Sequence, residues 1–201
     1  MNDKALFKLT SGLFLVTAKT NKDNGCIINT VLQVTASPVR IVIAINNKNY
    51  THDMVKETGL FKISVLSETA PMDLYKRFGY ISGRDTDKFS GYRGAAYSDN
   101  GCLYLTEYSN AYLSGKVIET VDLGTHTLFI ADVTDAQILS YGEPVTYSYY
   151  QKNIKPAPEK KTGNKSGFIC TICGYIYEKD TLPEDFICPV CKHGTEAFKP
   201  I

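Results

Sequence analysis

Two Cys-x-x-Cys pairs near the C-terminus constrain this chain more than any other feature. The pairs are Cys170 with Cys173 and Cys188 with Cys191, and fourteen residues separate them. Each pair places two sulfur atoms on one tight turn, and the segment between them lets the turns meet around a tetrahedral metal ion. The alternative is a pair of disulfide bonds in a small secreted domain. The spacing favours a four-cysteine metal site.

Charge and hydropathy exclude several functional classes. The net charge of the 201 residues is +1, which gives no electrostatic reason to bind nucleic acid or an anionic membrane. No segment reaches the roughly 18 apolar residues of a membrane span. The N-terminus, MNDKALFKLTSG, lacks the basic and apolar regions of a signal peptide. We therefore expect a cytoplasmic protein, and a reducing compartment disfavours disulfides.

Four thiolates suit either iron or zinc, so the residues around them decide the expectation. The segments CTICGYIY (170–177) and LPEDFICPVC (182–191) surround the cysteines with apolar and aromatic side chains. Over residues 168–201 the sequence resembles the rubredoxin family in its short form. Lys192 departs from the family, which usually has glycine there. The resemblance implies one iron held by Cys170, Cys173, Cys188 and Cys191, inside an aromatic core of Tyr175, Phe186 and Phe198. A structural zinc site is the alternative.

Residues 151–166, QKNIKPAPEKKTGNKS, read as a linker. The segment has two prolines, five lysines and almost no apolar side chains. As a flexible coil it would reach about 20–24 Å, enough to carry the metal module between two sites. A passive spacer is the alternative. The expected domains are 1–150, the linker 151–166, and a metal domain at 167–201.

The first 150 residues predict a mostly-β domain with a few short helices. Short β-branched and aromatic runs at 12–18, 39–45, 60–66 and 127–133 are bounded by Gly, Pro, Asn or Asp, as in a barrel or a sandwich. Residues 49–58 and 72–78 are expected to form short helices. No G-x-G-x-x-G segment follows a strand and no Walker A motif occurs, so a Rossmann or P-loop domain is not supported.

Two polar clusters interrupt this pattern. Residues 29–38, NTVLQVTASP, mix hydroxyl and amide groups into an apolar stretch, and such a segment can bind a planar polar heterocycle. Residues 46–53, NNKNYTHD, gather a lysine, amides and a hydroxyl at an expected helix N-terminus, which suits a phosphate. The alternatives are an ordinary strand and an N-capped surface helix.

In this order the two clusters resemble the flavin reductase-like family, the FMN-binding split β-barrels. The resemblance spans 6–150 and includes FKISVLS (61–67), FGYISGRDTDKF (78–89) and GTHTLFIADV (124–133). It implies an FMN ring near the first cluster, a phosphate near the second, and a loop at 78–88 beside the flavin. The implied cofactor residues are Asn29, Thr30, Val31, Leu32, Gln33, Asn46, Lys48, Asn49, Thr51, Phe78, Ser82 and Lys88.

The same resemblance implies catalytic roles for His126 and Arg84, close to where nicotinamide approaches. The alternatives are a satisfied histidine at a strand end and a surface ion pair of Arg84 with Asp85. Such domains are usually homodimers, and the tyrosine-rich segment 141–150 is a candidate contact. Cys26 and Cys102 are expected to be buried structural thiols.

The two halves together suggest one electron-transfer circuit. NAD(P)H releases a hydride, a one-iron site accepts single electrons, and a flavin links the two processes. The fusion resembles the high-molecular-weight rubredoxins of anaerobes, which implies an NAD(P)H:rubredoxin-type oxidoreductase that supplies a flavodiiron oxygen or nitric oxide reductase. The alternatives are a free-flavin or ferric reductase with an accessory metal module, and an FMN-binding protein with a structural zinc site.

Overall fold

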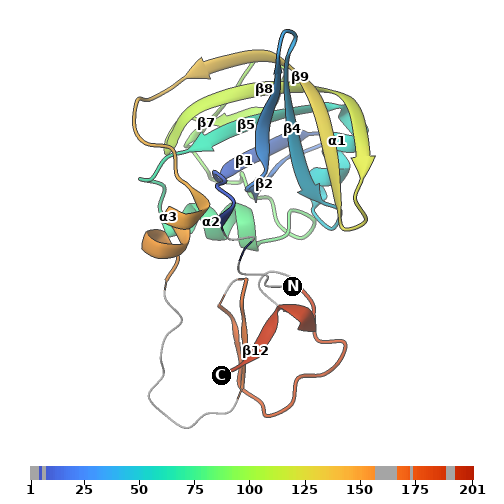
Figure 1. Cartoon of the computed structure of the whole chain (residues 1–201), viewed down its shortest axis with the longest axis vertical. Helices are drawn as coiled ribbons and strands as arrows, with labels where there is room; N and C mark the ends of the chain where they lie inside the picture. Colours follow the sequence, from blue (N-terminus) through green and yellow to red (C-terminus); the bar gives the residue numbers. More distant parts are fainter. Residues whose placement is uncertain (1–4, 6–7, 157–166, 173, 189–192) are drawn as a thin grey trace.

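The computed structural model describes residue 5 and residues 8–156, 167–172, 174–188 and 193–201. A large curved sheet forms the centre of the first domain, and a small three-stranded module follows it in the sequence (Figure 1). The predictions about Cys173, Cys191, Lys192 and linker residues 157–166 lie outside the described residues. The mostly-β prediction, with a small C-terminal module, is confirmed.

The large sheet has seven strands in the order β2-β1-β5-β8-β9-β4-β3, and every neighbouring pair is antiparallel. The predicted strands at 12–18, 39–45, 60–66 and 127–133 correspond to β1, β4, β5 and β9. A separate hairpin, β6 (Ala95–Tyr97) with β7 (Leu103–Leu105), lies outside this sheet. The strands of the large sheet are β1 Phe14–Lys19, β2 Asp23–Ile28, β3 Val31–Ala36, β4 Val39–Asn46, β5 Leu60–Leu66, β8 Ser109–Asp122 and β9 His126–Ile138.

The sheet forms an incompletely closed barrel, because the connection between its two edge strands is short. Strands β2 and β3 occupy opposite edges of the sheet, yet only Asn29 and Thr30 connect them. Since an extended residue spans at most about 3.6 Å, the two edges must curl toward each other. Asn29 and Thr30 therefore lie at the split between the edges.

The predicted helix at 49–58 is present as α1 (Tyr50–Thr58). Met54 and Val55 are buried against Ile43, Ile45 and other apolar side chains of the sheet. The helix ends at Gly59, whose φ of 68° gives the left-handed C-cap that glycine adopts without a Cβ penalty. Helix α1 thus closes one end of the barrel and presents its N-terminus near Asn46.

The predicted helix at 72–78 is two helical segments. Helix α2 (Met72–Tyr75) continues as the π-helix η2 (Lys76–Tyr80). Leu74, Tyr75 and Phe78 are buried in a second apolar cluster beside the split.

A further helical segment leads out of the large domain. Helix α3 (Tyr147–Tyr149) continues as η3 (Tyr150–Ile154), so helix extends into the range expected to be linker. Tyr150 is buried and Ile154 packs against the same second cluster. Apolar side chains hold these first residues after 150 to the sheet domain.

The C-terminal module is a three-stranded sheet in the order β11-β10-β12, with a short 3-10 helix just before β12. Its aromatic core contains Tyr175, Phe186 and Phe198, as predicted, together with Phe168 and Tyr177. None of the described helices is long and apolar enough to cross a membrane. The elements are β10 Phe168–Cys170, β11 Ile176–Tyr177, the 3-10 helix η4 Thr195–Ala197 and β12 Phe198–Pro200.

Candidate functional site

Two adjoining hollows lie at the split of the barrel. Their volumes are about 260 and about 300 Å³, close to the lower end of the range for small-molecule pockets. Both hollows are lined by Ile27, Asn46, Asn49, Gly79, Tyr80, His126 and Ile172. We call the two together the split cavity.

Strand register explains why distant sequence segments meet at this cavity. Asn46, the last residue of β4, pairs with His126, the first residue of β9. Asn29 and Thr30 line the same cavity from the β2–β3 connection. The first polar cluster, the second polar cluster and the predicted histidine are therefore brought together.

Asn29 and Thr30 also line a third hollow, which Val31 and Leu32 share. The Leu32 side chain is 62% exposed on strand β3. Gln33 lies outside the described hollows, and its Nε2 donates to the carbonyl of Thr35 at 3.1 Å. The predicted ring-binding segment thus divides, with Asn29 and Thr30 at the cavity and Gln33 directed along the hairpin.

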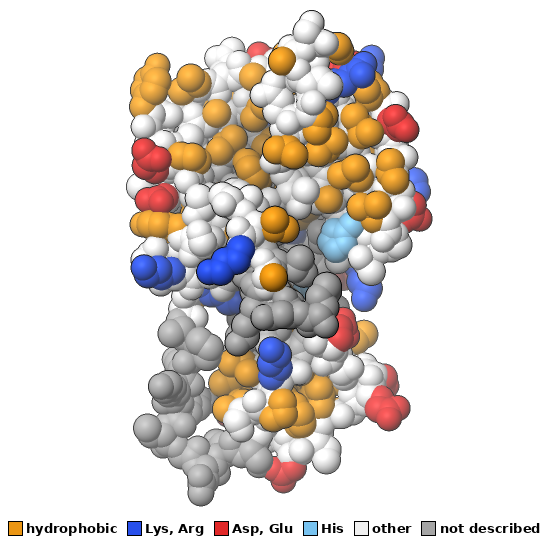
Figure 2. Space-filling model, in the orientation of Figure 1, with side chains coloured by type: hydrophobic (Ala, Val, Ile, Leu, Met, Phe, Trp, Pro, Cys, Tyr) orange, Lys and Arg blue, Asp and Glu red, His pale blue; other side chains and the backbone are white. Residues whose placement is uncertain are grey.

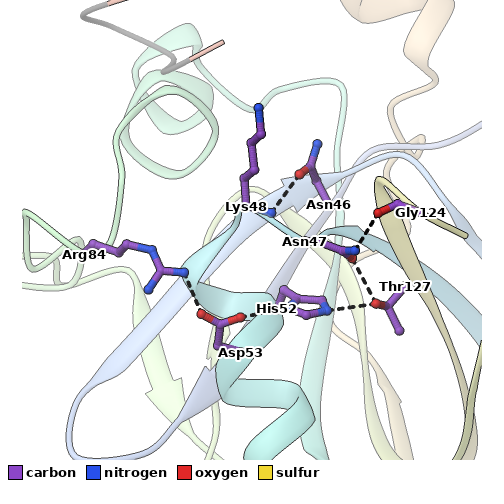
Figure 3. Close-up of polar contacts among 8 residues, drawn as sticks. All are labelled: Asn46, Asn47, Lys48, His52, Asp53, Arg84, Gly124 and Thr127. Atoms are coloured by element: carbon purple, nitrogen blue, oxygen red, sulfur yellow. Dashed lines mark hydrogen bonds and ion pairs between the residues drawn. The ribbon is translucent and has the colours of Figure 1, made fainter. Parts of the chain in front are cut away.

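The predicted phosphate residues surround the N-terminus of α1. Asn46, Lys48, Asn49 and Thr51 all line the larger hollow. The backbone N–H of Lys48 donates to Asn46 Oδ1 at 2.9 Å, while the Lys48 side chain extends away from the neighbouring hydrogen-bond network (Figure 3). An exposed lysine beside the positive end of a helix dipole suits an anion.

A hydrogen-bond network adjoins this site and stabilises it (Figure 3). His52 Nδ1 lies 2.9 Å from Asp53 Oδ1, and His52 Nε2 lies 2.9 Å from Thr127 Oγ1. Thr127 donates to Asn47 Oδ1 at 2.9 Å, and Asn47 Nδ2 donates to the carbonyl of Gly124 at 2.9 Å. The network ties α1 to the β8–β9 turn that carries His126.

Arg84 joins the outer end of this network. Its Nη2 lies 2.5 Å from Asp53 Oδ2, so its ionic partner is Asp53 and not the neighbouring Asp85. Burial acts to raise the pKa of the Asp53 carboxyl, but the hydrogen bonds from His52 and Arg84 outweigh it and leave the pKa below its ordinary value. Arg84 is not one of the described residues that line the split cavity.

The loop after η2 packs closely on strand β2. A Cβ built on Gly83 would lie 2.1 Å from Asn24 Oδ1, so only glycine fits here without displacing the buried Asn24. Asn24 Nδ2 in turn donates to Thr51 Oγ1 at 2.9 Å. Ser82 lines the larger hollow beside Gly83. The predicted loop therefore reaches the cavity through Ser82 and Gly83.

Lys88 is buried in the wall of the larger hollow. Its Nζ donates to the carbonyls of Gly25 at 2.8 Å and Phe78 at 3.0 Å, which ties β2 to η2. The Phe78 side chain is fully buried and packs against Phe89 and Tyr92. Phe78 thus supports the site through its backbone and the core, and lies outside the described cavity lining.

Burial lowers the pKa of Lys88 to about 8, from 10.5. Between pH 8 and pH 10 the unfolded chain then binds more protons at this lysine than the folded chain, so its contribution to folding stability rises with pH, by on the order of 2–3 kcal/mol. We expect this rise in the free energy of unfolding of the parent minus that of Lys88→Met, measured by urea denaturation from pH 7.5 to pH 10. The matched control is the exposed Lys76, whose replacement by Met should give a flat difference; a flat difference for Lys88→Met would contradict the prediction.

The smaller hollow is lined by several tyrosines that were not among the predicted cofactor residues. Tyr80 Oη and Tyr150 Oη lie 2.8 Å apart, and the Tyr75 and Tyr150 rings are 4.6 Å apart. Tyr147 and Tyr150 line this hollow, and they belong to the segment 141–150 that is the candidate for a dimer contact. Tyr141 is 95% exposed. The density of tyrosines was the available signal, but it did not indicate which surface they line.

The cavity walls combine apolar side chains with a few polar ones, among them Asn29, Thr30 and His126. An apolar cavity with a few convergent polar groups fits a flavin ring, and the lysine and amides at α1 fit its phosphate.

The described part of the metal module fits a thiolate-bound metal. Cys170 and Cys188 are both buried in one cluster with Phe198 and the partly buried aromatic rings. Gly174, next to Cys173, has a φ of 81°, and its N–H donates to the Cys170 carbonyl at 2.8 Å, which closes a tight chelating turn. Buried thiolates in a dry aromatic shell are suitable ligands for iron or zinc.

The other two cysteines are buried, as expected. Cys26 and Cys102 are 3% and 2% exposed. Burial raises the pKa of both thiols, which disfavours the thiolate needed for nucleophilic or metal chemistry.

Comparison with known proteins agrees with this geometry. The flavin reductase like domain matches residues 6–158, and the rubrerythrin, rubredoxin-like domain matches residues 168–199. The chain is 39% identical to the high molecular weight rubredoxin of Moorella thermoacetica, with 100% of each chain covered. It is 38% identical to the ferric-chelate reductase (NAD(P)H) of Archaeoglobus fulgidus, covering 75% of this chain and 89% of that one.

A solved structure shares the fold of the large domain. The NADH:FAD oxidoreductase of Streptomyces globisporus C-1027 superposes with a TM-score of 0.66 at 19% identity, covering 72% of this chain and 85% of that one. The matches support an oxidoreductase with a flavin and an iron centre. The chain belongs to the flavin reductase-like family and carries a C-terminal rubredoxin-like domain, the arrangement of the high-molecular-weight rubredoxins.

Proposed function

We propose that this protein oxidises NAD(P)H through FMN in the split cavity and passes the electrons to iron in the metal module. The observation that carries the proposal is that one cavity is lined by Asn29, Thr30 and His126 of the large domain and by Thr171 and Ile172 of the metal module. The last two residues stand between the ligands Cys170 and Cys173. The proposed hydride-accepting site and the proposed one-electron site would thus share a boundary.

The proposed FMN site uses residues of both polar clusters. Asn29 and Thr30 would contact the ring, while Val31 and Leu32 border the neighbouring third hollow. Lys48 and the α1 N-terminus would bind the phosphate, and Ser82 and Lys88 would support the same wall. When bound, the flavin supplies the chemistry that accepts a hydride and releases electrons singly.

His126 is the proposed residue of the nicotinamide site. It lines both hollows, and its Nδ1 lies 2.9 Å from Thr125 Oγ1, which fixes the ring orientation. We assign a positioning role to Arg84, because its ion pair with Asp53 holds the 82–84 loop against α1. The net reaction is NAD(P)H + 2 Fe(III) → NAD(P)⁺ + H⁺ + 2 Fe(II).

We also propose a homodimer formed by the exposed β3–β4 hairpin and the adjacent sheet face. The hairpin extends beyond the rest of the sheet, and hydrophobic side chains gather over the large domain (Figures 1 and 2). Contiguous exposed apolar surface of this kind is typical of a subunit interface. The exposed residues include Leu32, Val34, Val39, Ile118, Val121 and Leu123.

The final acceptor in the proposal is a flavodiiron oxygen or nitric oxide reductase. A chain ending at Pro156 tests this, since it keeps η3 and the packed Ile154 but lacks the metal module. We expect this variant to oxidise NAD(P)H with an artificial acceptor such as ferricyanide, and to lose NAD(P)H-driven reduction of the flavodiiron protein. If it reduced the flavodiiron protein as fast as the full chain, the metal module would be accessory, and a ferric-chelate reductase would be the better assignment.

A further inference from the structure

A lysine of the large domain holds the metal module at the cavity. Lys155 Nζ donates to the carbonyls of Thr171 at 3.1 Å and Ile172 at 3.0 Å. The backbone N–H of Lys155 donates to the carbonyl of Tyr150 at 2.8 Å. Since Tyr150 is buried and hydrogen-bonded to Tyr80, the base of Lys155 is anchored to the sheet domain while its ammonium group binds the module.

The contacted turn of the module is the one that carries two metal ligands. Thr171 and Ile172 lie between Cys170 and Cys173, and an ammonium group that bonds both carbonyls fixes the position of this turn. The docked orientation therefore directs a chelating turn, and not the opposite end of the module, toward the cavity.

Ile172 also occupies space inside the cavity mouth. Its side chain lines both hollows, as does His126, and His193 of the module joins the wall of the larger hollow. A nicotinamide ring that approaches the flavin beside His126 would need this space.

We propose that Lys155 docks the Thr171–Ile172 turn over the split cavity, and that docking and NAD(P)H binding exclude each other. The inference rests on the proposed flavin site. Electron entry and electron exit then use the same opening in turn: the module leaves for the nucleotide to bind, and it returns for transfer to the iron.

We expect this docking to be reversible, because the two Lys155 hydrogen bonds that hold the described part of the module are exposed, and each such bond contributes modestly to binding in water. We expect Lys155→Met to lower the ratio of docked to undocked protein about tenfold, which corresponds to about 1.4 kcal/mol. Lys155→Arg keeps the charge and the donors, and should restore most of the docking.

Photo-crosslinking measures docking without relying on turnover. p-Benzoylphenylalanine replaces Ile172 in the full chain loaded with flavin and iron, and mass spectrometry identifies the peptides that it captures. We expect adducts on peptides that contain Tyr80 or His126, a several-fold lower yield with Lys155→Met, and the parent yield with Lys155→Arg. Lys152→Met is the matched control, because Lys152 is exposed and forms no hydrogen bond to the described residues of the module.

The exclusion of nucleotide is tested in the same material. A tetrahydronicotinamide analogue of NAD(P)H, which donates no hydride, should lower the crosslinking yield, and Lys155→Met should speed flavin reduction at subsaturating NAD(P)H. A yield that neither Lys155→Met nor the analogue changes would overturn the docking. A yield that falls with Lys155→Met but not with the analogue would overturn the exclusion. Failure of the proposed function looks different, because NAD(P)H then fails to bleach the flavin while the Lys155 series still reports on docking.

Discussion

Replacing Cys170 by serine is expected to remove the iron centre and to stop electron delivery to a partner protein. Cys170 is 1% exposed and lies in the same aromatic cluster as Cys188. A serine hydroxyl does not replace a thiolate ligand, and a module of this size depends on its metal for folding. Loss of a residue that only hydrogen-bonds a metal ligand already costs about 10- to 100-fold in a metal site, so loss of a ligand itself should slow reduction of the partner protein more than about 100-fold.

The measurement combines metal analysis, visible spectra and kinetics. The ferric tetrathiolate absorption should disappear in Cys170→Ser, while NAD(P)H still bleaches the flavin at the parent rate or faster. Cys102→Ala is the control, because this buried thiol belongs to the sheet domain and should leave the iron in place. Retained iron together with unchanged partner reduction in Cys170→Ser would contradict the assignment of this cysteine.

Charge reversal at Lys48 is expected to weaken FMN binding about 100-fold without affecting riboflavin. The exposed Lys48 side chain lines the larger hollow beside the N-terminus of α1. Lys48→Glu removes an attraction to the phosphate and adds a repulsion, and each change is worth about tenfold, or about 1.4 kcal/mol. Riboflavin has no phosphate, so its dissociation constant should be unchanged.

Fluorescence quenching titrations with FMN and riboflavin measure both constants. Lys56→Glu is the matched control, since Lys56 is an exposed lysine in the last turn of the same helix. An equal loss of affinity for FMN and riboflavin in Lys48→Glu would indicate a disturbed fold. No loss for either would place the phosphate elsewhere.

The regular elements could be predicted because local patterns determine them. Strand β4 buries Ile41, Ile43 and Ile45 with a period of two, and α1 ends at a glycine with positive φ. The four cysteines and the aromatic residues of the module likewise carry their signal in spacing and residue type. These features need no knowledge of distant contacts.

The composition of the cavity could be predicted only in part, because long-range packing determines it. Phe78 belongs to a motif that matches the flavin reductase-like family, but its side chain packs in the apolar cluster with Phe89 and Tyr92. Arg84 is held by Asp53, thirty-one positions away in the sequence. Tyr75 and Tyr150 enter the cavity wall because the second cluster brings α2 and η3 together. Neither composition nor spacing carries such information.

The contact between the two domains was also beyond the sequence. The lysine-rich composition of 151–166 indicated a linker, but it did not distinguish Lys155 from Lys152. Of these two lysines, it is Lys155 that follows η3 and whose ammonium group meets the Thr171 and Ile172 carbonyls. The two lysines differ because Lys152 lies within η3, whereas Lys155 lies immediately after its end.

An anaerobic titration with NAD(P)H tests the central claim, that hydride electrons pass through the flavin to the iron of the same protein. A flavin takes up two electrons and one iron takes up one, so three electrons should be consumed per chain, or about 1.5 equivalents of NAD(P)H. The proposed circuit predicts that both the flavin absorption and the ferric thiolate absorption are lost by that point. Bleaching of the flavin at about one equivalent, with the ferric absorption unchanged, would contradict it.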